Sequence, residues 1–211
     1  MILDLRTIFA VGAVTCIILG LMQVVAYLIG RFEHWPLWWG ASNTLIGLGV
    51  VGASLRDTAP DFMSITVANT VMWIGCLVLL MGIRSFSGRA RRLPFYVAAV
   101  ALPAILLTAW IEPEGFSRRV ALMSLLLAAC DIAVVREGVR LFRRERLLSA
   151  VILIGFFAPT ALIFGLRAAH AMRGGMGGGL FPAGGSGFHW LAVIAIERPG
   201  RSPMTFWDTV S

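Results

Sequence analysis

The feature that most constrains this chain is a series of six long apolar stretches, each bordered by arginine. The stretches cover residues 8–29, 37–55, 65–83, 93–111, 120–135 and 147–166. A helix needs about 20 apolar residues to cross the hydrocarbon core of a bilayer, which is about 30 Å thick. Backbone polar groups find no water in that core, so such stretches must be helices. The sequence therefore predicts an all-α fold, a polytopic transmembrane helical bundle with six full spans.

The fifth stretch is the shortest, and it carries the one acidic side chain of the six, Asp131. We extend this span to residues 120–138, past Arg136, because a long arginine side chain reaches back to the membrane surface. Acidic residues inside a membrane are functional candidates by default. Because Asp131 lies only five residues before Arg136, the position favours a structural ion pair with an arginine. A signalling or proton-linked role is the alternative.

A seventh apolar stretch is too short to cross the membrane. It follows the glycine-rich run 174–187, covers residues 188–196 and stops at Glu197. Nine helical residues reach only about 13 Å at 1.5 Å each. We expect a half-helix here, followed by a polar outer tail at 197–211. The candidate partner contacts are Trp190, Phe206 and Trp207, because aromatic side chains anchor interfaces. The alternative is a tail that lies loosely on the outer leaflet.

All 18 basic residues are arginines, and the net charge is +7. Without lysine the chain has neither the Walker A lysine of a P-loop nor the amine of a retinal Schiff base. Ten arginines lie in the first, third and fifth connections, against six at the amino terminus, in the other two connections and just after the sixth span. The positive-inside rule explains this pattern without nucleic acid or nucleotide, and it places the amino terminus and the tail outside.

Polar side chains within the spans are few. Asn43 and Asn69 share the context Asn-Thr followed five residues later by Gly, and we expect each to bond a neighbouring helix; contact with a ligand is the alternative. The second span also holds small residues suited to close helix packing: Gly40, Ala41, Ser42, Gly47, Gly49 and Gly52. No histidine pair has ligand spacing and no nucleophile motif occurs, so we predict no catalytic, cofactor or metal residue and no enzyme activity.

The segment from Trp39 to Arg91 resembles the amino-terminal multi-pass region of bacterial membrane-bound GGDEF-type diguanylate cyclases. The pattern is Trp39-Gly40-x2-Asn43-x5-Gly49, Leu55-Arg56, Pro60-Asp61-Phe62-x-Ser64-Ile65, Ala68-Asn69 and Gly82-Ile83-Arg84-x-Phe86-x-Gly88-Arg89. The resemblance implies a sensory input module in a bacterial inner (cytoplasmic) membrane. This chain departs from the family in its short seventh stretch and in lacking a GGDEF segment, so the resemblance does not imply cyclase activity.

Two functional classes follow from these observations. The first is a non-catalytic accessory subunit, a single domain over residues 1–211, bound to other integral membrane proteins and to the lipid bilayer. The second is a sensory module that binds a small ligand between its helices and signals through a partner. A transporter or intramembrane enzyme is a third, less favoured class. The missing output domain favours the accessory subunit, because a sensor without an output must work through a partner.

Overall fold

The computed structural model describes residues 5–30, 34–56, 58–86, 93–112 and 115–173, and this part of the chain contains helices and no strands. The elements are α1 (Leu5–Ile29), α2 (Trp35–Ser54), the π-helix η1 (Phe62–Val67), α3 (Ala68–Phe86), α4 (Leu93–Ala109), α5 (Phe116–Glu145) and α6 (Leu148–Met172). The all-α prediction is therefore confirmed. The half-helix 188–196 and the tail 197–211, with Trp190, Phe206 and Trp207, lie outside the described residues.

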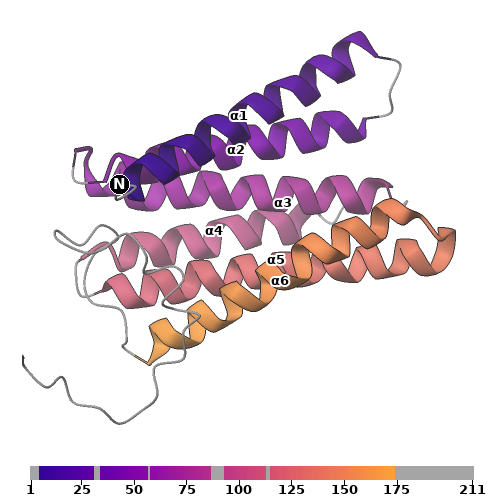
Figure 1. Ribbon diagram of the computed structural model, residues 1–211. Coiled ribbons are helices and arrows are strands. Elements are labelled where there is room, and N and C mark those ends of the chain that lie inside the picture. Colours follow the sequence, from indigo (N-terminus) through magenta and orange to yellow (C-terminus); the bar gives the residue numbers. More distant parts are fainter. Residues whose placement is uncertain (1–4, 31–33, 57, 87–92, 113–114, 174–211) are drawn as a thin grey trace, which may run out of the picture.

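The helices lie alongside one another, and consecutive helices run in opposite directions (Figure 1). Helix α1 packs on α2, α2 on α3, α3 on α5 and α5 on α6, while α4 contacts mainly α3 and η1. The turns from α1 to α2 and from α5 to α6 lie at one end of the bundle (Figure 1). Helices α1 and α6 are consequently the outermost members of the bundle, each packed mainly against a single neighbour.

The predicted spans differ in their bounds from the helices observed, as three of them illustrate. Helix α5 has 30 residues, which at 1.5 Å each is about 45 Å, rather than the span 120–138. Helix α6 continues to Met172 instead of ending at 166. Helix α3 is preceded by η1 from Phe62, so helical structure begins three residues before the predicted 65. Apolar runs mark the part of a helix that hydrocarbon surrounds, whereas helical hydrogen bonding continues into the polar boundary.

Glycines bring α1, α2 and α3 into close contact. A Cβ atom added to Gly40 would lie 2.8 Å from the carbonyl oxygen of Gly20, so neither position accepts a larger residue without movement of a helix. On the opposite side of α2, the Ser42 hydroxyl donates a hydrogen bond of 2.8 Å to the carbonyl oxygen of Gly75. Small residues at helix crossings and hydrogen bonds across them are the usual basis of helix association in membranes. The predicted packing role of the small residues of α2 is therefore confirmed at Gly40 and Ser42.

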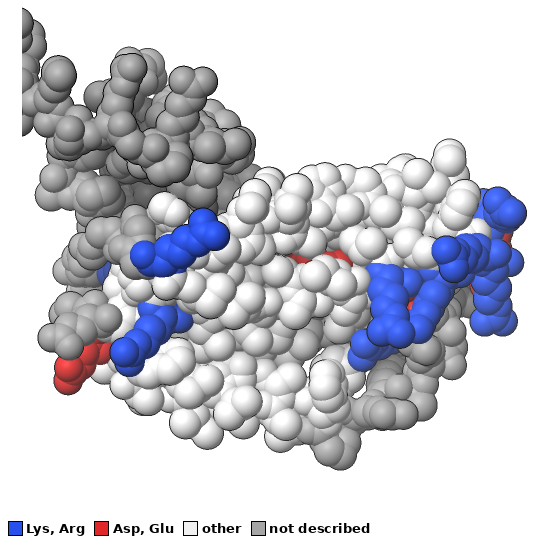
Figure 2. Space-filling model, turned by 90° about the horizontal axis from the view of Figure 1, so that it is seen from below, with Lys and Arg blue, Asp and Glu red and all other residues white. Residues whose placement is uncertain are grey.

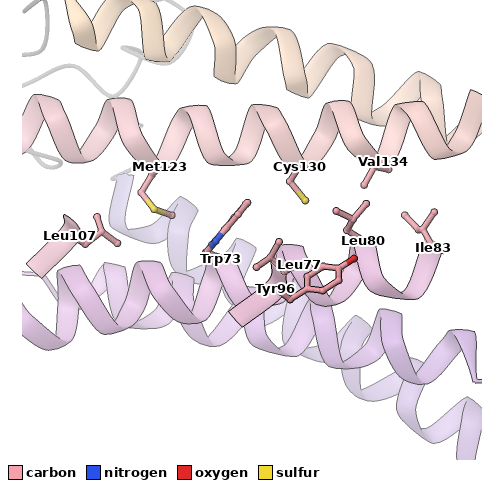
Figure 3. Packing of buried hydrophobic residues seen from close by; sticks show 9 residues of the cluster. All are labelled: Trp73, Leu77, Leu80, Ile83, Tyr96, Leu107, Met123, Cys130 and Val134. Atoms are coloured by element: carbon pink, nitrogen blue, oxygen red, sulfur yellow. The ribbon is translucent and has the colours of Figure 1, made fainter. Parts of the chain in front are cut away.

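The buried core lies where α3, α4 and α5 meet (Figure 3). Its members come from α3 (Trp73, Leu77, Leu80, Ile83), α4 (Tyr96, Leu107) and α5 (Met123, Cys130, Val134). Cys16, Cys76 and Cys130 are free thiols within the helices. This junction connects the group α1–α2–α3 with the pair α5–α6.

The outer surface is apolar between two charged ends. On the face seen in Figure 2, arginines lie at both ends, and the surface between them is uncharged except for a small acidic patch near its middle. Exposed large apolar side chains cover α1, α4 and α6, among them Leu28, Ile105 and Leu162. Among the residues that the structure describes, three helical segments are long and apolar enough to cross a membrane, Phe9–Ile29, Phe62–Ser85 and Leu148–Met172. This surface is that of a membrane protein.

Candidate functional site

Helix α5 carries a buried row of polar side chains along its length. The row comprises Arg119, Ser124, Asp131 and Glu137, all less than 9% exposed. Helix α5 packs on α3 and on α6, so its polar residues are held inside the bundle. Burial of so many polar groups within a membrane protein requires compensating partners. The hydrogen-bond and charge partners of each residue therefore decide which role it can have.

Glu137 is the centre of a charged cluster that joins three helices. Its side chain is 3% exposed, and its Oε1 atom lies 3.2 Å from Nη1 of Arg140 and 3.7 Å from Nε of Arg84 on α3. Arg84 also donates a hydrogen bond of 3.0 Å from Nη1 to the hydroxyl of Tyr96 on α4. The cluster thus connects the arginine-rich ends of α3, α4 and α5.

Asp131 is buried, 8% exposed, and has no arginine partner among the described residues. Its Oδ2 atom makes no hydrogen bond there. The Thr160 hydroxyl of α6 lies beside the carboxyl group, yet that hydroxyl donates to the carbonyl oxygens of Phe156 and Phe157 at 3.4 and 3.0 Å. The expected ion pair at Asp131 is therefore not formed with any arginine of the described residues. Arg136, which follows five residues later, is exposed on another face of α5.

At the other end of α5, the Arg119 side chain caps the C-terminal end of α4. Its Nη1 atom donates to the carbonyl oxygens of Trp110 and Glu112, the latter at 2.7 Å. The last carbonyls of a helix have no partner within the helix, and a basic side chain is a common substitute. Burial lowers the pKa of Arg119 from its ordinary value, repulsion from Arg56 lowers it further, and Asp61 opposes both. These three charges therefore lie near one another at this end.

The two asparagines behave differently from each other. The Asn43 amide donates a hydrogen bond of 3.0 Å to Oε1 of Gln23 and so joins α2 to α1, as expected. The Asn69 amide instead donates to the carbonyl oxygen of Ile65 in η1, at 2.6 Å. The expectation that Asn69 bonds a neighbouring helix is wrong, because the π-helical turn before it presents a nearer acceptor.

An open groove lies between the start of the third helical segment and the last turns of α4. Its volume is about 650 Å³, and it is lined by Phe62, Thr66, Val67, Thr70, Val71, Ala104, Ile105, Thr108 and Ala109. The lining is apolar apart from the three threonine hydroxyls. A volume of this size falls within the range of roughly 300–1,000 Å³ that is common for ligand sites. The sequence offered no sign of the groove, because the patterns that contain Phe62 and Thr70 do not indicate an apolar groove.

The buried acid Glu137 was also missed. It follows Arg136 in a charged stretch that reads as the solvated end of a helix, and only the length of α5 and the position of Arg84 place it inside. Helical periodicity gave no signal either, since the six residues from Asp131 to Glu137 are not close to a whole number of turns. Within the described ranges, no group of three His, Cys, Asp or Glu residues is arranged to hold a metal ion.

Comparisons of this chain with family models, with curated proteins and with solved structures find no match.

Proposed function

We propose that the chain is an integral protein of the bacterial inner membrane whose six helices all cross the bilayer, and that it acts without catalysis as an accessory subunit of a larger membrane complex. The aligned helix ends, with arginines at both and an apolar surface between them, support six crossings (Figure 2). Helix α5 is polar because its charges point into the bundle or lie at its ends, and α2 is only moderately apolar because its small residues serve helix packing.

The observation that carries the proposal is the outward face of α6. In the bundle, glycines such as Gly40 and Gly138 lie against a neighbouring helix, whereas Gly155 and Gly165 of α6 have no atom within 4 Å of an added Cβ. Pro159 has no N–H to donate to the Gly155 carbonyl. The face is completed by exposed apolar side chains at helical spacing: Leu148, Ile152, Leu162 and Leu166. Small residues and a freed carbonyl favour close contact with another membrane helix.

The orientation that we propose follows the arginine count. The end that holds Arg84, Arg136, Arg140, Arg143, Arg144 and Arg146 faces the cytoplasm, and the amino terminus and the tail face the periplasm. We further propose that the half-helix 188–196 and the tail, with Trp190, Phe206 and Trp207, add to the contact with the partner. Descent from a sensory input module of the diguanylate cyclase type accounts for the sequence pattern around α2 and α3.

The second candidate is a sensory module that binds a ligand between helices. The groove beside α4 favours it, because α4 contacts mainly α3 and η1. Besides its core side chains Tyr96 and Leu107, side-chain hydrogen bonds hold this part of the chain at three heights. These come from Arg84 to Tyr96, from Trp73 to the Ala99 carbonyl at 2.7 Å, and from Arg119 to Trp110. A helix attached in this way has room to shift when the groove is filled.

Purification in mild detergent tests the accessory role. The tagged full chain is extracted from the membranes of the organism that makes it, and its complexes are resolved by native electrophoresis, for the unaltered chain, Gly155→Leu and Gly12→Leu. Gly12 is the matched control, because it too has open space around it but lies on α1. We expect a defined complex that Gly155→Leu disrupts and Gly12→Leu preserves. A chain that migrates alone, or a complex indifferent to Gly155→Leu, contradicts the proposal.

Deletion of residues 199–211 tests the tail separately. If the tail belongs to the contact, the deletion weakens the complex seen with the full chain. An unchanged complex after this deletion shows that the contact lies elsewhere.

A further inference from the structure

Two threonines in the wall of the groove differ from four other helical threonines of the described chain. A threonine inside a helix usually donates its hydroxyl proton to the carbonyl four residues before it. Those that do so here are Thr15, Thr44, Thr108 and Thr160. The hydroxyl oxygens of Thr66 and Thr70 are buried and have no partner in the described structure. Both residues line the groove, and Thr66 is 5% exposed.

The π-helix η1 explains why these two hydroxyls have no hydrogen-bond acceptor. The carbonyls that they would use, those of Phe62 and Thr66, both belong to η1. In a π-helix the hydrogen bonds run to the fifth residue, as Ala68 shows by donating to the Met63 carbonyl. The wider turn changes the position of each carbonyl relative to the side chain one turn later. Such π segments within helices occur frequently at functional sites.

The groove opens onto the apolar surface near one end of the bundle. Phe62 and Ile105, on its two walls, are exposed together with the apolar side chains of the outer surface. Exposed Asp61 directly precedes η1, and Glu112 follows α4 three residues after the lining residue Ala109. Thr66 is five residues from Asp61, about one turn into the apolar zone. This is the depth at which lipid ester groups lie, between the hydrocarbon core and the headgroups.

We propose that the groove binds a membrane phospholipid, with one acyl chain between η1–α3 and α4 and its ester carbonyl accepting hydrogen bonds from Thr66 and Thr70. The apolar lining matches the acyl chain, and the two threonine hydroxyls that lack an acceptor match the ester carbonyl oxygen. Helical threonines populate two χ1 rotamers, and rotation between them turns the covered hydroxyl toward the groove. This inference rests on the membrane location of the chain and not on a partner protein.

The experiment uses the full chain in vesicles of phosphatidylethanolamine and phosphatidylglycerol that contain a trace of a phospholipid with a photoreactive diazirine in one acyl chain. After illumination, mass spectrometry locates the labelled residues. Unlabelled competitors are a diester phospholipid and its diether analogue, which lacks the carbonyl oxygens. We expect labelling to concentrate on residues 62–71 and 104–109. We also expect the diester to compete about three- to tenfold better than the diether, the range that one or two net hydrogen bonds give.

The double variant Thr66→Val, Thr70→Val should abolish the difference between diester and diether while leaving the apolar groove in place. Thr108→Val is the matched control, because that hydroxyl lines the same groove but already donates to the Ala104 carbonyl at 2.8 Å; it should retain the difference. Equal competition by the two lipids in the unaltered chain overturns the role of the hydroxyls. Labelling spread evenly over α1 and α6 overturns the site itself. The comparison of competitors in the unaltered chain decides the matter even if a variant fails to fold.

Discussion

At the scale of single residues, the two buried acids of α5 have opposite surroundings. Glu137 lies within 4 Å of two guanidinium groups, whereas Asp131 has an Oδ2 atom without a hydrogen-bond partner. Removing one member of a buried ion pair leaves the other charge uncompensated, while removing an isolated buried charge relieves a cost. The two acids should therefore respond in opposite directions to neutralisation.

Glu137→Gln should lower the stability of the bundle by about 1–3 kcal/mol, because Arg84 and Arg140 lose their counter-charge, and these arginines are partly exposed, which limits the loss. Thermal unfolding in detergent, followed by helical circular dichroism, measures the change. Glu145→Gln, an exposed acid on the same helix, is the control and should leave the midpoint unchanged. An equal effect of both variants would show that the cluster contributes nothing specific.

Asp131→Asn should leave folding and membrane insertion intact and keep or raise the unfolding midpoint at neutral pH. The amide is nearly the same size, and it removes a carboxylate that has no arginine partner in the described structure. The amount of protein in isolated membranes and its unfolding midpoint are the measurements. Loss of the protein from membranes would contradict this reading and would indicate that the carboxylate has an essential partner.

At the scale of helices, close packing and lipid exposure divide the glycines into two kinds. A Cβ atom on Gly20 would lie 2.4 Å from the Thr44 hydroxyl oxygen and 2.8 Å from the Gly40 carbonyl oxygen, whereas Gly12 on the same helix has nothing within 4 Å. The same substitution should therefore have different effects at two sites of one helix.

Gly20→Ala should lower the free energy of unfolding by about 1–3 kcal/mol, because α1 must move away from α2. Gly12→Ala should be neutral or should stabilise the helix by about 0.5–1 kcal/mol, because alanine restricts the unfolded backbone. Denaturation in mixed micelles with increasing sodium dodecyl sulfate measures both. Equal losses of unfolding free energy at the two positions would contradict the close contact between α1 and α2.

The positions of the helices could be predicted from the sequence, because every helix that crosses a bilayer needs an apolar run of about the same length. The helix ends beyond that length could not, since the extra turns of α5 and α6 contain charged residues that apolar runs exclude. The interhelical role of Asn43 followed from its residue type alone. The surroundings of Asp131, the partners of Glu137 and the groove depend on which helix faces which, whereas the hydrogen bond of Asn69 depends on the π-helical turn before it. Nothing in the spacing along one helix encodes that arrangement.

At the scale of the whole molecule, the central claim is that all six helices cross the bilayer. By length and apolar composition, α1, α3 with η1, and α6 qualify by themselves. Helices α2, α4 and α5 can cross the bilayer only as members of the bundle. Helix α2 depends on its packing against its neighbours, and α4 is short, with 17 residues. Helix α5 has its charges inside the bundle or at its ends. The side of the membrane on which each connection lies distinguishes six crossings from three.

The decisive measurement is the accessibility of single cysteines in a chain whose three native cysteines have been replaced. Thr58→Cys, Glu112→Cys and Glu145→Cys place one thiol in the second, fourth and fifth connections, and a membrane-impermeant maleimide is applied to intact spheroplasts and to opened membranes. Six crossings predict that Thr58→Cys and Glu112→Cys react from the outside and that Glu145→Cys reacts only after opening. If only α1, α3 and α6 crossed, the thiols at positions 112 and 145 would lie on the same side and the thiol at 58 on the other. That result would contradict the six-span bundle.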